Sequence, residues 1–375
     1  MILNETPIRT SKNYGINNIK LDIEIPKKIE EFNNLTITGD TSNFSISNKV
    51  TKTPLKFGNG KELETQIFES ANQNIKIIPE SSGMLCLEFN LNEDNSVLVE
   101  NIEIETNPNS NQTVVIKYIS DDKFNCYHNG IIRVNTKPNS KTKIIIVNMV
   151  NNNSNNFLSI ENELSENSKL DYCIVDFGGS SSITNWYSNV KGENSEANIN
   201  TIYLGTENQI FDINYISELY GKNTKTNIEV QGALKGEAKK NFKGTINFKK
   251  GCKKAKGDEN EFCMLLSKKA RSKALPMLLC TEEDVEGNHS TATGKIEEQK
   301  LFYLMSRGIS YQDSTKLIVK AKFNSVLETI ENEKLKEEIL KEIDKRLEDK
   351  INLWKDYRKW IKILNKIFHL LKITI

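Results

Sequence analysis

A short phrase recurs about every 28 residues through the middle of the chain. Each copy is an Asn followed by Ser or Thr, and the copies are Asn109-Ser110, Asn139-Ser140, Asn167-Ser168, Asn194-Ser195 and Asn223-Thr224. An alternating apolar segment follows each copy. Asn tolerates unusual backbone angles and hydroxyl side chains close turns, whereas an alternation of period two is typical of a half-buried strand. The spacing therefore predicts a chain that turns and extends at regular intervals.

The repeats predict a β-solenoid. No helical pattern of useful length lies between the copies, so they are not strand–helix–strand units. A coil of two or three short strands stacked on the next coil, as in a parallel β-helix, explains the period most simply. A weaker copy falls near residues 251–253. We expect four segments: 1–80, partly irregular; 81–294, the solenoid core; 295–350, a helical domain; and 351–375, a separate tail.

The composition fits a slender fold and excludes one class of partner. Hydrophobic residues make up 37% of the chain and the mean hydropathy is −0.51, which suits a solenoid with much surface for its core. The 51 Lys and Arg residues nearly balance the 50 Asp and Glu residues. A formal charge of +1 gives no basic field for binding nucleic acid.

The cysteines and the first residues indicate a reducing compartment. The six cysteines form no CxxC pair. Residues 1–24 are polar and lack the continuous apolar core of a signal peptide. We therefore expect a cytoplasmic protein with reduced thiols.

The hydrophobic period changes to that of a helix after Gly294. Residues 301–305 predict a first helix that ends at Arg307-Gly308, and Ser310 is a plausible N-cap for a second helix. A third helix is predicted over 331–350. Its apolar stripe consists of Leu335, Ile339, Ile343 and Leu347.

The tail, residues 351–375, is a basic amphipathic segment. Its apolar face carries Leu353, Trp354, Tyr357, Trp360, Ile361, Leu364, Ile367, Phe368 and Leu371, and its other face carries Lys355, Arg358, Lys359, Lys362, Lys366 and Lys372. One interpretation is a helix lying on an anionic membrane surface. We favour the other, a terminal helix docked on its own domain or on a partner. Basic residues interrupt the apolar run too often for a spanning helix.

The chain has no nucleotide-binding loop. Gly294-Lys295 comes nearest, but Ile296 stands where Ser or Thr belongs. Cys280 and His289 lie nine residues apart with acidic residues between them. A thiolate, an imidazole and carboxylates can hold iron. On spacing alone, however, Cys280 is better explained as a small buried side chain, and we interpret Cys252 and Cys263 as core residues.

A polysaccharide-cleaving β-helix is the enzymatic alternative. Such an enzyme needs acidic residues clustered on one face of several coils. Apart from residues 282–286, the acidic residues here are scattered. We therefore expect a protein that is not an enzyme.

Three consecutive segments resemble one known family. Residues 264–276, MLLSKKARSKALP, resemble the "LLS-x-x-A-x-x-x-x-x-P" stretch of the SufB/SufD family, and 284–289, DVEGNH, resemble its "D-V-x-C-S-H" segment. Residues 301–309, LFYLMSRGI, resemble its "LFYL-x-SRGI" helix. Order and spacing agree over residues 232–345. Gly287 departs from the pattern, because the family usually has cysteine there.

The resemblance implies a fold, a process and partners. It implies a right-handed parallel β-helix and a non-enzymatic component of the Suf machinery for iron–sulfur cluster assembly. It also implies pairing with a SufB paralogue, or with a second copy, through the β-helix. Residues 297–345 would dock the SufC-type ABC ATPase, with Phe302, Tyr303, Arg307 and Gly308 shaping that domain.

The resemblance also assigns the candidate cluster residues. His289 matches a SufD histidine at the SufB interface, where a transient iron–sulfur cluster is thought to form. Cys280 falls where SufB carries its essential cysteine. The compact length and the Ser-Arg-Gly variant favour SufD, whereas Cys280 favours a SufB-like scaffold that itself holds the cluster.

Overall fold

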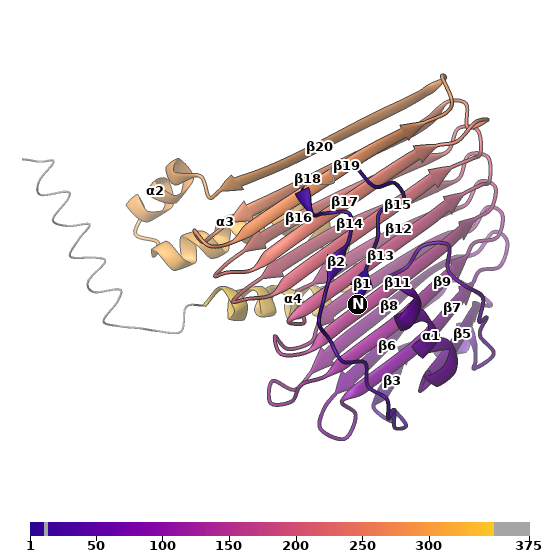
Figure 1. The fold of residues 1–375 in the computed structure, drawn as a ribbon, viewed down its shortest axis with the longest axis horizontal. Coiled ribbons are helices and arrows are strands. Elements are labelled where there is room, and N and C mark those ends of the chain that lie inside the picture. Colours follow the sequence, from indigo (N-terminus) through magenta and orange to yellow (C-terminus); the bar gives the residue numbers. More distant parts are fainter. Residues whose placement is uncertain (11–13, 349–375) are drawn as a thin grey trace, which may run out of the picture.

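The chain folds into a two-sided β-solenoid with helices at its carboxyl end (Figure 1). The computed structural model describes residues 1–10 and 14–348. Two nine-stranded sheets face each other, and from β5 to β20 the chain passes from one sheet to the other with each strand. The predicted mainly β solenoid fold is confirmed, with two strands in each coil.

The two sheets are named here by their last strands. Sheet 1 contains, in spatial order, β20 (Val285–Lys295), β18 (Ala255–Leu265), β16 (Lys225–Leu234), β14 (Glu196–Gly205), β12 (Lys169–Asp176), β10 (Lys141–Met149), β8 (Asn111–Ser120), β6 (Gly83–Leu91) and β3 (Leu35–Gly39). Sheet 2 contains β19 (Arg271–Cys280), β17 (Lys239–Phe248), β15 (Ile210–Leu219), β13 (Ser181–Val190), β11 (Asn155–Leu164), β9 (Tyr127–Asn135), β7 (Val97–Glu105), β5 (Gln73–Pro79) and β4 (Phe44–Ser47). All pairs are parallel except β3–β6 and β4–β5.

The recurring Asn residues form one corner of the solenoid. All five have a positive φ between 53 and 61°, a conformation that Asn tolerates better than most residues. The hydroxyl that follows each Asn closes the turn, as predicted. Ser140 Oγ, for example, donates a hydrogen bond to the Lys137 carbonyl oxygen at 2.7 Å. Lys254, with a φ of 61°, takes the corner position in the weaker last copy. The phrase therefore marks a backbone requirement repeated once per coil.

Alternation places the core between the sheets. On β10, Ile144 and Ile146 belong to the interior cluster, whereas Ile145 and Val147 belong to a second cluster on the outer face. Because parallel strands pair in register, the same alternation is repeated on neighbouring strands. The solenoid thus has an apolar interior and an apolar strip on the outside of sheet 1.

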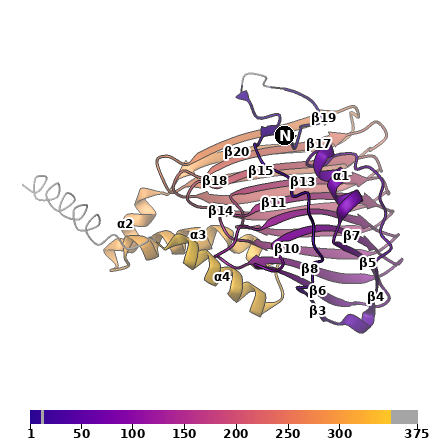
Figure 2. The ribbon, with the colours of Figure 1, turned by 60° about the horizontal axis from the view of Figure 1, so that its bottom comes forward.

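Two helices cover that outer strip (Figure 2). They are α3 (Tyr311–Leu327) and α4 (Glu333–Leu347), and α2 (Glu298–Ser306) precedes them. The Ser310 side chain accepts a hydrogen bond from the Asp313 amide, so the predicted N-cap is confirmed. The predicted stripe on α4 is buried in full. Helices α3 and α4 therefore pack directly on the outer face of sheet 1.

The first 80 residues are more ordered than their composition predicts. They contain β3, β4, β5 and the helix α1 (Lys61–Ser70), and α1 packs on the outside of sheet 2. Residues at the amino terminus, with strands β1 (Ile2–Leu3) and β2 (Ile19–Lys20), cover the same face. Asn4 is buried there and donates to Asp212 Oδ1 at 2.7 Å.

The amphipathic tail predicted over 351–375 lies outside the described residues. Within the part of the chain that the structure describes, no helix is long and apolar enough to span a membrane.

Candidate functional site

The solenoid ends in two strands that are each paired on one side. β19 pairs only with β17 and β20 pairs only with β18, so within residues 1–10 and 14–348 no strand pairs with the outer edges of β19 and β20. Nearly all of β20 is exposed. Unpaired backbone N–H and C=O groups on a long edge are a template for another strand. The end formed by β19 and β20 is therefore called the open end.

His289 lies on β20 at the open end. It pairs in register with Glu259 of β18, and Glu259 is a buried interior residue. The flanking residues point the other way, since Asn288 and Ser290 donate to Asp258 and Asn260 at 2.9 and 2.7 Å. Because successive side chains alternate between faces, the His289 imidazole lies on the interior side of the sheet.

Cys280 is the last residue of β19. All six cysteines lie in the described residues, and Cys280 is the exposed one among them. Its Sγ lies 2.8 Å from the carbonyl oxygen of Glu282 in the turn that leads to β20. The interpretation of Cys280 as a buried core side chain is therefore wrong, because the solenoid ends before another coil can cover it.

Cys280 and His289 share the open end but are not neighbours. His289 is four residues beyond Val285, where β20 begins, which is about 13 Å along a strand. Among the described residues, no group of three His, Cys, Asp or Glu side chains lies where it could hold a metal ion. The open end of one chain thus presents two separate ligand-type side chains rather than a finished metal centre.

The two upstream cysteines are core residues, as predicted. Cys252 and Cys263 are fully buried. Burial, together with the nearby Glu282 carboxylate and Cys280, raises the pKa of the Cys252 thiol to about 11. Burial also raises the pKa of the Cys263 thiol. Both thiols therefore remain protonated and unreactive at neutral pH.

An interior carboxyl beneath His289 was not predicted. Glu259 is 0% exposed and neither of its carboxyl oxygens has a hydrogen-bond partner within the described residues. Burial raises its pKa to about 8, and the Glu261 charge adds to the effect. Gly244 lies opposite, where a Cβ would stand 2.0 Å from Glu259 Oε1. The absent side chain at Gly244 provides the space that the carboxyl occupies.

The next acidic residue on β18 is paired. Glu261 Oε1 accepts a hydrogen bond from the Lys240 Nζ at 2.6 Å, and both side chains are fully buried. The alternation of Gly257, Glu259, Glu261 and Cys263 in the sequence could have indicated two acids on the interior face. Acidic residues are so rarely buried, however, that the pattern favoured a solvated strand.

A second candidate surface lies on the helices. Phe302 and Tyr303 of α2 are 74% and 58% exposed. Beside them is a groove of about 570 Å³, the α2/α3 groove, lined by Gln299, Lys300, Tyr303, Leu304, Leu317, Ile318 and Ala321. Arg307 caps α2 and its guanidinium lies 5.4 Å from the centre of the Tyr303 ring. Gly308 has a φ of 86° and ends the helix as predicted.

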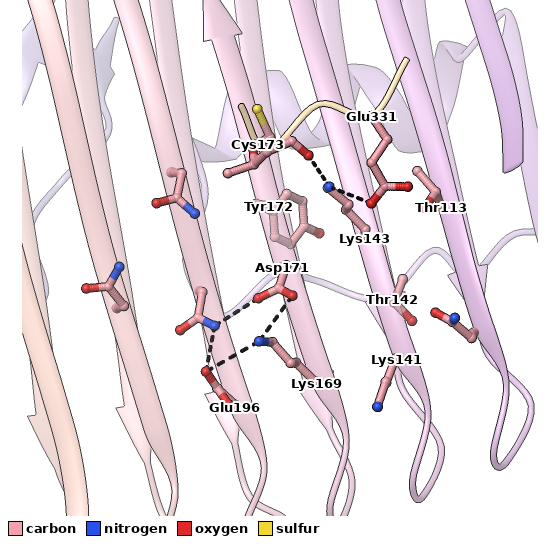
Figure 3. A pocket seen from close by; sticks show the side chains of 15 residues that line it. Thr113, Lys141, Thr142, Lys143, Lys169, Asp171, Tyr172, Cys173, Glu196 and Glu331 are labelled. Atoms are coloured by element: carbon pink, nitrogen blue, oxygen red, sulfur yellow. Dashed lines mark hydrogen bonds and ion pairs between the residues drawn. The ribbon is translucent and has the colours of Figure 1, made fainter. Parts of the chain in front are cut away.

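A polar pocket of about 700 Å³ lies where the α3–α4 connection meets sheet 1 (Figure 3). Lys143 donates to the Thr329 carbonyl oxygen and pairs with Glu331 at 3.5 Å. Lys169 pairs with Asp171 and Glu196 at 3.5 and 3.7 Å. The Lys143 contacts join the α3–α4 connection to sheet 1, whereas the Lys169 pairs lie within the sheet.

Comparison with known proteins places the chain among assembly factors. The family described as "SUF system FeS cluster assembly, SufBD core domain" matches residues 89–322. SufD of Bacillus subtilis is 26% identical over 180 residues, and SufD of Escherichia coli is 30% identical over 173 residues. A SufBD family protein of Pyrococcus horikoshii is 34% identical over 139 residues.

The similarity covers part of each protein. The three alignments cover 48%, 45% and 37% of this chain in the same order. They cover 41%, 40% and 31% of the relatives' own lengths. The matched family region runs from the last residues of β6 through α2 and most of α3, and so includes both the open end and the α2/α3 groove.

Proposed function

The chain belongs to the SufBD family of the SUF system for iron–sulfur cluster assembly and is most like SufD, and from that premise we propose that it is a non-catalytic, SufD-like scaffold subunit. In this proposal it pairs with SufB through the solenoid and binds the SufC ATPase through α2 and α3. The nascent iron–sulfur cluster is cargo that the assembled complex builds and releases.

The open end supports pairing with SufB. Strands of 10 and 11 residues, β19 and β20, present unpaired edges side by side. A paralogue with the same architecture would present matching edges, and pairing would continue both sheets across the interface. His289 and Cys280 would then lie at the junction. This coincidence of two unpaired edges with two ligand-type side chains is the observation that carries the proposal.

The α2/α3 groove supports docking of SufC. Aromatic side chains beside an aliphatic groove are typical of the central residues of protein interfaces. α2 extends beyond the ends of the strands, where a partner can reach it (Figure 1). Tyr303 and Phe302 would anchor the ATPase, with Arg307 and Gly308 shaping the end of α2.

The packing of α3 and α4 supports mechanical coupling to the solenoid. Val319 and Phe323 of α3 and Ile339 of α4 are buried in the same apolar cluster as Val147 and Val175 of sheet 1. A movement of SufC that shifts these helices would therefore act on sheet 1, whose last strand is β20. ATP-driven motion would open the junction so that Cys280 or His289 becomes available.

Anaerobic co-purification with SufB and SufC tests the proposal. The complex should carry iron and sulfide, and His289→Ala and Cys280→Ala should lower both contents. Cys86→Ala is the matched control, because Cys86 lies on β6 near the opposite end of sheet 1. A complex that never forms, or equal iron and sulfide in all variants, would refute the proposal.

The exposure of Cys280 favours one second candidate, a SufB-like scaffold that holds the cluster without a paralogue. The same purification performed without SufB separates the two. Iron and sulfide on a homodimer with SufC alone, lost in Cys280→Ala, would favour the SufB-like function.

A further inference from the structure

The α2/α3 groove leaves apolar side chains uncovered. Leu317 of α3 is 48% exposed and Tyr303 of α2 is 58% exposed, and both line the groove. Ile318 and Ala321 lie farther along the same wall. Contiguous apolar surface of this kind marks a binding site for another apolar element.

The described chain ends against α3, the helix that forms one wall of this groove. α4 ends at Leu347, and Glu348 Oε1 lies 3.4 Å from the Nζ of Lys316, the residue before Leu317. One turn back, Asp344 pairs with Lys320 of α3 at 2.6 Å. The end of α4 is thus fastened to the stretch of α3 that also carries the groove residues Leu317, Ile318 and Ala321, and the tail follows Glu348 in the sequence.

The sequence of the tail fits a groove of this kind. Its apolar residues recur at Leu353, Tyr357, Trp360, Leu364 and Phe368, which is the three- and four-residue spacing of one helix face. Peptides that bind as a helix in a groove are anchored by side chains with this spacing. Residues 349–352, between Glu348 and the first anchor, can span about 13 Å when extended.

We propose that the tail binds as an amphipathic helix in the α2/α3 groove of its own chain. It covers Tyr303, Leu317 and Ile318 until the ATPase displaces it, so the tail regulates access to the docking surface. The regulatory part of this inference rests on the proposed function, whereas the docking of the tail does not.

Proximity favours the chain's own tail over other molecules as the segment that binds in the α2/α3 groove. A segment attached a few residues from its site has an effective concentration in the millimolar range. A second copy or an anionic membrane must compete with that concentration. The basic face of the tail stays in solvent when the apolar face is in the groove.

Tryptophan quenching by acrylamide tests the docking directly. The chain has three Trp residues: Trp186 is fully buried in the solenoid, and Trp354 and Trp360 lie in the tail. In the full chain without vesicles, the tail tryptophans should be shielded, and Leu317→Glu should raise the quenching constant severalfold. Ile46→Glu is the matched control, because Ile46 is also half-exposed but lies on β4.

Three results would overturn the docking. They are equal quenching of the wild type and Leu317→Glu, shielding that disappears on dilution, and shielding that requires anionic vesicles. The second would mean an interaction between copies and the third a membrane-bound tail.

Binding of SufC tests the regulatory part separately. Leu364→Glu, in the tail, should tighten SufC binding severalfold because it releases the groove, whereas unchanged binding would refute competition. If SufC bound neither the wild type nor Leu364→Glu, the proposed function would fail, and the quenching result would still decide whether the tail docks.

Discussion

The Asn223 side chain donates a hydrogen bond from its Nδ2 to Oδ1 of Asn194, 3.1 Å away and one coil earlier in the solenoid. Asn194 in turn donates to Asn167 at 3.0 Å. Each of these residues also holds a positive φ. The corner is therefore stabilised both by backbone conformation and by a ladder of side-chain amides.

Two substitutions separate those contributions. Asn194→Ala keeps a Cβ in the left-handed region and loses the ladder, so it should lower the free energy of unfolding by about 2 kcal/mol or more. Asn194→Gly loses the same hydrogen bonds but accepts the positive φ and should cost less. Urea unfolding followed by circular dichroism measures both. An equal loss in the two variants would show that the backbone angle contributes nothing.

Glu259→Gln should stabilise the protein increasingly as the pH rises. The Glu259 pKa is raised from 4.5 to about 8 in the folded state, mainly by burial. Below pH 4.5 the Glu259 carboxyl is protonated in both the folded and the unfolded chain. Between pH 4.5 and about 8 only the unfolded chain ionises, which costs about 1.4 kcal/mol of stability per pH unit. Gln removes this dependence.

Urea unfolding at pH 5, 6.5 and 8 measures the difference between wild type and Glu259→Gln. If the free energies of unfolding of wild type and Glu259→Gln changed with pH in the same way, the Glu259 carboxyl would not be an unpartnered interior group. Glu261→Gln is the comparison, since it leaves Lys240 without its carboxylate and should destabilise the protein by about 3–5 kcal/mol.

A buried ion pair fastens the amino terminus to sheet 2. Lys243 pairs with Asp212 with both side chains fully buried, and Lys243 Nζ donates to the Asn4 carbonyl oxygen at 2.8 Å. Burial lowers the Lys243 pKa, whereas Asp212 opposes that shift. Asp212→Ala should cost about 3–5 kcal/mol because it leaves a buried charge unpaired.

Unfolding in urea and limited proteolysis of residues 1–10 report that loss. The double variant Asp212→Leu, Lys243→Met should recover most of the stability but not the full protection of the amino terminus, because Asn4 loses its hydrogen bonds to the Asp212 carboxylate and the Lys243 ammonium. Full protection in the double variant would show that the ion pair does not hold this segment.

Thiol labelling should find one fast-reacting cysteine per folded chain. Cys280 is exposed, whereas burial raises the pKa values of Cys173 and Cys252 to about 11. Reaction with a disulfide reagent at pH 7.5 should consume one thiol rapidly, and Cys280→Ser should abolish that phase. A fast phase that persists in Cys280→Ser would contradict the exposure of this residue.

The sequence predicted those features that repeat or that follow local rules. The Asn-Ser phrase located the solenoid because each coil needs the same backbone angle at its corner. Ser310 and the stripe that includes Ile339 located α3 and α4 because caps and helical periods are local signals. The packing of these helices on sheet 1 depends on contacts between segments that are distant in the sequence, such as α3 with β14 and β16, which no local pattern records.

The candidate site was predicted less completely. Cys280 and His289 were identified correctly as residues at the end of the repeats, but their separation depends on the turn between β19 and β20. Glu259 was missed because nothing in a single sequence distinguishes an interior acid from a solvated one. Strands β3, β4 and β5 were missed because each is only four to seven residues long.

The two ends of the solenoid differ, and the difference limits how many copies can join. At the far end the short antiparallel strands β3 and β4, of five and four residues, lie outside the last parallel coil and reverse the direction of the backbone. A partner that continues the parallel strands β19 and β20 would find only short strands of reversed direction at the far end. Short edge strands disfavour the addition of further strands, so this end protects a rod of stacked coils from growing into a fibre.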